Sequence, residues 1–390
     1  MAALRVDTLL VQAAKATSSP ESRSHSGETT PQDAPTLSLV ICTLDEHEAI
    51  GGVLRELDQH LGGISHEIIV VDDSADPRTA DAVAAYAADH PQVRLVRRYM
   101  ANGLSSAAIK GWDVSTGHIL AIMDGDGQHD PALIRALLEK LADPGTDIAV
   151  ASRYLDDPRS GLHGLRHRLS RSGIWLTDVT LGVPLADPLS GCFAMTRDWY
   201  AHVRRNLSGL GFKILIDVVA SGARKPHAAQ IPTLLRARTG GESKLDTRVI
   251  IDLVALLIEK RTQGRFTATA LMASMASSSA LCLQWLALGV LLKLAAPLWL
   301  AMLLSAGVGL AGRFGVLLLT TPRSRRPASA HQLMRQWRGF CLHRWSDVPL
   351  NAGFAVPLGL AHCPWPIAAL AGLLLAESRY HLGSLVGVKA

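Results

Sequence analysis

The sequence predicts an α/β domain with a doubly wound, largely parallel sheet, followed by an α-helical membrane domain. Three observations lead to this prediction. Short β-rich runs alternate with helical stretches between residues 37 and 142, at the spacing of βαβ units. Several of these runs end in acidic residues. Nearly all acids lie within 1–260, whereas 266–320 and 348–376 are almost free of charge.

The expected strands and helices follow one another along the first part of the chain. Strands are expected at 37–44, 66–73, 93–98 and 118–124. Helices are expected at 46–61, 77–89, 104–116 and 131–142. The strands are continuous apolar runs, which is typical of strands covered by helices on both faces of a sheet.

The second part of the chain is predicted to span a membrane. The uncharged stretch 266–292 is long enough to cross a bilayer, and a second apolar run covers 294–320. The basic segment 321–345 follows, and the positive-inside rule places it in the cytoplasm. The block 348–376 contains Pro357, Pro364 and Pro366 and is either one long tilted span or two short ones. Two short spans are favoured, which makes four in total.

These boundaries divide the chain into five parts. Residues 1–35, rich in Ser, Thr, Pro and Ala, are expected to be disordered and do not resemble a signal peptide. The other parts are the α/β domain at 36–246, a basic amphipathic connector at 247–265, the membrane domain at 266–382 and a tail at 383–390. We therefore expect an integral membrane protein whose α/β domain faces the cytoplasm.

Charge and cysteine content restrict the function classes. The net charge is +5, and the basic residues gather at 153–171, 222–265 and 321–344, near or between the apolar blocks. This placement fits an anionic membrane surface or phosphate-bearing lipids, and no nucleic acid is expected as a partner. Five scattered cysteines without a CxxC motif indicate a reduced compartment and no structural zinc. A GxGxxG after the first strand and a P-loop are both absent from the sequence.

Polar residues stand where three of the expected strands end. They are Thr43, Asp45 and Glu46 after the first strand, Asp73 after the second, and Asp124 and Asp126 after the fourth. Ligands of open α/β sheets bind at the carboxyl ends of the strands. Two carboxylates one residue apart can converge on Mg²⁺ or Mn²⁺, which prefer oxygen ligands and also bind substrate phosphates. A solvated acidic turn is the alternative for a single such pair.

Six motifs in order resemble glycosyltransferase family 2, specifically its polyprenyl-phosphate (dolichyl-phosphate) mannosyl- or glucosyltransferase branch. They are VICTLDEHEAI, VVDDSADPRTAD, NGLSSAAIKGWDVSTGHILAIMDGDGQHDP, ASRY, ADPLSGCFAMTR and RARTGGESKL. The resemblance covers roughly 36–246 and implies the GT-A fold. The sequence departs from the family pattern at Cys42, where proline is usual, and at Leu44-Asp45, where Tyr-Asn is usual.

The resemblance implies a donor site. Asp124, Asp126 and Gln128 would hold the divalent cation and the diphosphate of a nucleotide sugar. Asp73 would lie near the base or ribose, with Thr43, Asp45 and Glu46 at the first strand's nucleotide contacts. Glu46 is equally well explained as an acid at a helix N-terminus.

Basic residues complete the implied donor site. Arg238 and Lys244 lie in a glycine-containing loop that closes over the nucleotide in the family, where cations neutralise the diphosphate leaving group. An ordinary basic loop near a membrane is the alternative for this segment.

An acceptor site is implied by Arg153, Arg166 and Ser170, which match family positions for a lipid monophosphate. Arg166 and Ser170 are four residues apart and would share one helix face, and arginine suits phosphate binding. Interfacial binding to bulk anionic lipid is the alternative.

The resemblance implies inverting transfer of a hexose from a nucleotide sugar to polyprenyl monophosphate. The acceptor is already an anion, so positioning and charge stabilisation by Asp126, Arg153, Arg238 and Lys244 would suffice for catalysis. GDP-mannose is favoured over UDP-glucose. The alternatives are a polyprenyl-phosphate glucosyltransferase, a processive polysaccharide synthase, and a lipid-carrier flippase or scaffold fused to an inactive transferase domain.

Overall fold

The computed structural model describes residues 35–98, 103–155, 174–182, 185–236, 247–320 and 329–344, together with 357, 364 and 367. The chain divides into two compact units, Met1–Ala268 and Thr269–Ala390. The N-terminal segment expected to be disordered falls outside the described residues up to residue 34. Most of the last apolar block, 348–376, and the tail also lie outside them.

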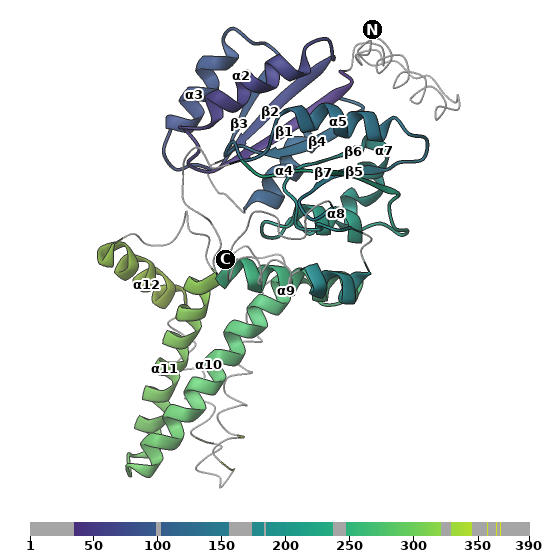
Figure 1. Ribbon diagram of the computed structural model, residues 1–390. Helices are drawn as coiled ribbons and strands as arrows, with labels where there is room; N and C mark the ends of the chain where they lie inside the picture. The colour runs from purple at the N-terminus through teal and green to yellow at the C-terminus, as the bar shows by residue number, and fades with distance from the viewer. Residues whose placement is uncertain are drawn as a thin grey trace, which may run out of the picture. The chain divides into compact units, whose positions relative to one another are not determined.

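The described part of the first unit contains a seven-stranded sheet in the order β3-β2-β1-β4-β6-β5-β7 (Figure 1). The strands are β1 Leu37–Thr43, β2 His66–Asp72, β3 Val93–Arg97, β4 Ile119–Asp124, β5 Ile148–Ser152, β6 Phe193–Thr196 and β7 Ala228–Pro232. Strand β6 runs antiparallel to β4 and β5, and the other neighbouring pairs are parallel. This arrangement confirms the largely parallel α/β sheet that the alternating pattern predicts.

Helices cover both faces of the sheet. They are α2 Ile50–Leu61, α3 Arg78–Ala87, α4 Leu104–Asp113, α5 Ala132–Leu141, α7 Arg197–Val203, α8 Ile214–Ala220 and α9 Thr247–Arg261. Helices α2, α3 and α5 share one apolar core with the sheet, and α4, α7 and α8 share another on the opposite face (Figure 1). Neighbouring residues of β1 enter different cores, Leu39 the first and Val40 the second, which explains the unbroken apolar run.

Helix α9 packs on the first unit through one face. Leu253, Leu256 and Leu257 contact the apolar cluster around Ile216 of α8. The opposite face of α9 leaves apolar side chains exposed at four-residue spacing, at Ile250, Val254 and Ile258.

The second unit is helical within its described residues. It contains most of α10 Ala268–Lys293, together with α11 Leu298–Thr320 and α12 Ala330–Arg344. Leu288 of α10 packs with Ala301 and Met302 of α11 in a small apolar cluster. Two stretches, Ala270–Lys293 and Leu298–Leu319, are long and apolar enough to cross a membrane by length and composition.

Candidate active site

The carboxyl ends of β1, β2 and β4 lie side by side at one edge of the sheet. Thr43 at the end of β1 pairs in register with Asp72 of β2, and Cys42 pairs with Asp124 of β4. Three of the strand ends singled out by the sequence therefore meet at one place, because parallel strands end at the same edge.

The β1 and β2 ends are joined by hydrogen bonds that centre on Asp72. Its Oδ1 atom accepts from the Thr43 hydroxyl at 3.0 Å and from the Ser74 hydroxyl at 2.6 Å. Ser74 Oγ also accepts from the backbone N–H of Asp45 at 2.8 Å, and Asp45 takes a left-handed φ of 58°. The Thr43 hydroxyl, expected to contact the nucleotide, thus bonds to Asp72 and shapes the turn.

Asp73 forms an ion pair that the sequence pattern does not indicate. Arg98, the residue after β3, donates from Nε and Nη2 to the two carboxylate oxygens of Asp73 at 2.6 and 2.5 Å. Arg98 also donates to the Gly103 carbonyl and the Ser106 hydroxyl at the start of α4. The orientation of Asp73 is therefore fixed by the neighbouring strand end and by α4.

Glu46 is buried in the turn that follows β1, with 6 % of its surface exposed. Helix α2 begins only at Ile50 and has no acidic residue in its first turn. The Glu46 carbonyl accepts from the backbone N–H groups of Ala49 at 3.1 Å and Ile50 at 3.0 Å, so Glu46 lies at the N-terminal end of α2. Its role as an acid at a helix N-terminus and its contact with the nucleotide both stay predictions.

The tip of β4 combines an accessible carboxylate with a buried one. The Asp124 side chain is 34 % exposed, whereas Asp126 is 6 % exposed and accepts from the Gln128 backbone N–H at 3.1 Å. The Gln128 side-chain nitrogen donates to the Arg236 carbonyl at 3.4 Å, which would leave the amide oxygen as the ligating atom. A Cβ atom on Gly191 would collide with the Asp124 carboxylate, so glycine is needed there to leave the carboxylate in this position.

His129 is a buried residue next to Asp124 at this tip. Its ring is 5 % exposed, and Nε2 lies 3.8 Å from Asp124 Oδ2. Burial lowers the pKa of His129, although the charges of Asp124 and Asp126 act in the opposite direction. The imidazole is therefore neutral near pH 7 and adds no charge to the acidic tip.

A buried ion pair joins β5 to the ADPLSG motif. Arg153, directly after β5, donates from Nε and Nη2 to Asp187 at 2.6 and 2.8 Å. Asp187 has no exposed surface, and the Arg153 side chain is 16 % exposed. Asp187 therefore fixes the guanidinium of Arg153.

Lys213 belongs to the same neighbourhood and is absent from the sequence-based site. It is half-buried at the start of α8. Burial and the charge of Arg153 lower the pKa of Lys213, while the carboxylates of Asp124 and Asp187 oppose that shift. A lysine in the otherwise apolar run FKILI is the signal that would have identified it.

Four of the predicted site residues, Arg166, Ser170, Arg238 and Lys244, lie outside the described residues. Arg236 is the last described residue before the expected basic loop. Its backbone N–H donates to the Gln128 carbonyl at 2.8 Å, so the chain enters that loop next to the β4 tip. Arg236 itself pairs with Glu56 and Asp130.

The oxygen donors of the β4 tip fit a hard divalent cation in type. Among the described residues no three side chains of His, Cys, Asp or Glu form a complete metal cluster. Mg²⁺ is usually bound by one or two carboxylates together with waters and substrate phosphates. Asp124 and Asp126 would thus suffice as the protein ligands of such a cation.

A mostly parallel α/β sheet with carboxylates at the ends of its central strands defines an open α/β domain, a class in which ligands bind at those strand ends. The profile of glycosyl transferase family 2 matches residues 38–204. A dolichol-phosphate mannosyltransferase of Saccharomyces cerevisiae is 33% identical over 50% of this chain and 73% of its own length. The chain belongs to glycosyl transferase family 2.

Two further relatives are also named as mannosyltransferases. A dolichol-phosphate mannosyltransferase of Pyrococcus furiosus is 32% identical over 55% of this chain and 61% of its own length. An undecaprenyl-phosphate mannosyltransferase of Micrococcus luteus is 27% identical over 55% of this chain and 89% of its own length. The match to the Pyrococcus protein thus spans less than two thirds of that relative.

Proposed function

We propose that this chain transfers a hexose, with mannose favoured, from a nucleoside-diphosphate sugar to a polyprenyl monophosphate. The observation that carries the proposal is the acidic tip of β4, Asp124 and Asp126, beside the ends of β1 and β2. This tip lies within the region that matches the family. The names of the three relatives support the sugar and the class of acceptor.

The donor would bind along the edge formed by the three strand ends. Asp124, Asp126 and Gln128 would hold Mg²⁺ or Mn²⁺ through their oxygen atoms, and a cation bound there would offset the charge of the diphosphate leaving group. Asp73, oriented by Arg98, would contact the nucleoside at the adjacent strand end. Asp45 and Glu46 would line the β1 side of the same edge.

The reaction needs little proton chemistry, because the acceptor phosphate is already ionised. An oxygen of that phosphate forms a bond to the anomeric carbon while the bond from that carbon to the diphosphate oxygen breaks. A single displacement inverts the configuration and releases the nucleoside diphosphate. Catalysis then consists of positioning and charge stabilisation.

Arginines and lysines would provide the complementary positive charge. Arg153 is held rigidly by Asp187 and would present its guanidinium to the acceptor phosphate. Arg166 and Ser170 would extend this acceptor site. Arg238 and Lys244 would neutralise the departing diphosphate, and the contact between Arg236 and Gln128 supports a loop that closes near the β4 tip.

A membrane location would bring the enzyme to its lipid acceptor. Only 22% of the apolar 18-residue stretch in each of Ala270–Lys293 and Leu298–Leu319 is buried. The core helices of a soluble protein would be mostly buried, so this low burial argues against that class of helix. The exposed stripe of Ile250, Val254 and Ile258 on α9 is suited to a lipid surface. We propose that these helices anchor the chain and that the catalytic domain faces the cytoplasm.

The alternatives differ in donor or in product. UDP-glucose would use the same strand-end site. A processive polysaccharide synthase would need a Gln-x-x-Arg-Trp acceptor motif directly after the catalytic domain. The nearest resemblance, RQWRGF at 335–340, lacks this order and lies in α12, after the apolar helices α10 and α11. This position disfavours the processive synthase.

The deciding experiment supplies membranes containing the full chain with radiolabelled GDP-mannose or UDP-glucose, Mg²⁺ and polyprenyl phosphate. We expect an organic-extractable lipid carrying one mannose from GDP-mannose. Membranes containing the Asp126→Ala variant provide the matched control and should form none. If labelled lipid formed from UDP-glucose alone, the transferred sugar would be glucose and not mannose. If labelled lipid formed from neither donor, the proposal would be contradicted.

A further inference from the structure

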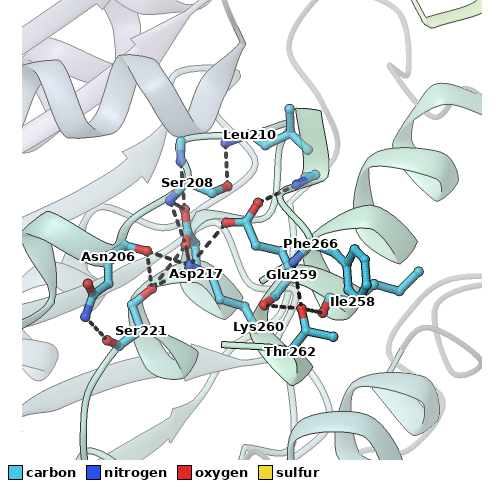
Figure 2. Close-up of polar contacts among 12 residues, drawn as sticks. Asn206, Ser208, Leu210, Asp217, Ser221, Ile258, Glu259, Lys260, Thr262 and Phe266 are labelled. Carbon is cyan, nitrogen blue, oxygen red and sulfur yellow. Dashed lines mark hydrogen bonds and ion pairs between the residues drawn. The ribbon is translucent and has the colours of Figure 1, made fainter. Parts of the chain in front are cut away.

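A buried polar cluster joins α9 to the loop 206–213. Its centre is an ion pair in which Lys260 Nζ lies 2.6 Å from Asp217 Oδ1 (Figure 2). The Lys260 side chain is 6 % exposed and that of Asp217 has no exposed surface. Surface pairs contribute little, but a buried pair is destabilising once one partner is removed.

The ammonium group of Lys260 has an acceptor for each of its three N–H bonds. These are Asp217 at 2.6 Å, the Asn206 carbonyl at 2.7 Å and the Ser221 hydroxyl at 2.7 Å. The pair therefore fixes the geometry of one particular arrangement of α8, α9 and residue 206, which a non-directional apolar contact would not do (Figure 2).

Asp217 uses its carboxylate to hold the loop that precedes α8. It accepts from the backbone N–H groups of Ser208 and Gly209, both at 2.9 Å. The negative charge of Asp217 strengthens these hydrogen bonds, and the positive charge of Lys260 offsets it in the buried site. Lys260 thus stabilises the conformation of the loop through Asp217.

The loop in turn packs on the first turn of α4. The Gly211 carbonyl accepts from the Ser105 backbone N–H at 3.0 Å. Gly209 has a left-handed φ of 65°, and a Cβ there would lie 3.3 Å from Ile109 Cδ1, so the contact is close. On the other side of the loop, a Cβ on Gly211 would meet Asp252 of α9 at 2.9 Å.

The same turn of α4 holds the arginine that orients Asp73. Arg98 donates to the Gly103 carbonyl at 3.3 Å and to Ser106 Oγ at 3.1 Å while it pairs with Asp73. A continuous series of contacts therefore runs from Lys260 through Asp217, the loop and α4 to Arg98 and Asp73.

We propose that Lys260 is a positioning residue for donor binding, which acts by holding loop 206–213 against the first turn of α4. The inference rests on the proposed function, because it takes Asp73 as part of the donor site. Residues in one hydrogen-bond network couple by about 0.5–3 kcal/mol. A tenfold change in nucleotide affinity corresponds to about 1.4 kcal/mol, which lies within that range.

The test uses the full chain in detergent and compares Lys260→Met with Arg94→Met. The control also replaces a cation by Met, in an ion pair with Glu67 at the opposite, amino-terminal edge of the sheet. The dissociation constant of GDP or UDP in the presence of Mn²⁺ is measured by calorimetry. Hydrogen exchange at residues 104–109 reports the first turn of α4 independently of any ligand.

We expect Lys260→Met to weaken nucleotide binding about tenfold and to accelerate exchange at residues 104–109. Arg94→Met should change neither nucleotide affinity nor exchange at residues 104–109, even if it lowers the melting temperature as much as Lys260→Met does. The double variant Lys260→Met/Asp217→Asn should recover much of the affinity, because asparagine keeps an oxygen acceptor for the loop without a buried charge.

Unchanged exchange at residues 104–109 in Lys260→Met would overturn the proposal, as would an equal loss of nucleotide affinity in Arg94→Met. If the unmodified chain bound neither GDP nor UDP, the proposed function would fail instead. In that case the exchange data alone would still decide whether Lys260 holds α4.

Discussion

Replacing Gly191 by alanine should displace Asp124 from the β4 tip without disturbing the fold around it. A Cβ atom at residue 191 would overlap the Asp124 carboxylate, and ordinary contacts of such an atom begin near 3.4 Å. The nearest carboxylate oxygen would have to withdraw by about 1 Å, a displacement that can cost about 100-fold in rate at a catalytic site.

The assay measures sugar transfer to polyprenyl phosphate over a range of Mn²⁺ concentrations. Gly191→Ala should lower kcat about 100-fold and raise the Mn²⁺ concentration needed for half-maximal activity. Gly52→Ala is the matched control, since no atom lies within 4 Å of a Cβ there and alanine favours the α2 helix. Wild-type activity and metal dependence in Gly191→Ala would refute the role of Asp124.

Two further predictions concern stability. Asp187→Asn should lower the free energy of unfolding by about 3–5 kcal/mol, because Arg153 would lose its buried carboxylate partner; an unchanged melting temperature would contradict this. Burial would raise the pKa of Glu67, but hydrogen bonds from Ser38, Thr116 and Arg94 outweigh it and hold that pKa below its usual value. Glu67 therefore stabilises the fold above its unfolded-state pKa, and this contribution is lost as the pH falls through the lower folded-state pKa. In melts from pH 7 to pH 3 the wild type should lose stability more steeply than Glu67→Gln, and parallel curves would contradict the assignment.

Most of the sheet was predictable because short stretches of sequence mark its strands and the helices between them. β1, β2 and β4 each contain at least four consecutive apolar residues, and the helices between the first four strands have a clear amphipathic period. Strand β6 was not predicted, because its four residues, FAMT, are too few to show a pattern. Its antiparallel direction depends on pairing with β4 and β5.

The gathering of acidic strand ends was also predictable, because the ends of parallel strands meet at one edge. The residues that form ion pairs and hydrogen bonds with acids in this region were not predictable. Arg98 and Asp73 are 25 residues apart, and Arg153 and Asp187 are 34 apart, so no spacing rule links them. The sequence likewise does not show that Asp72, and not Asp73, bonds to Thr43.

The most direct test of the central claim is calorimetric titration of GDP into the full chain, with Mn²⁺ and with EDTA. The strand-end site predicts that GDP binds in Mn²⁺, that EDTA removes most of the affinity, and that Asp126→Ala removes the difference between the two conditions. Binding of GDP that is equally strong with EDTA, and unchanged in Asp126→Ala, would contradict the assignment of Asp124 and Asp126 as the donor site.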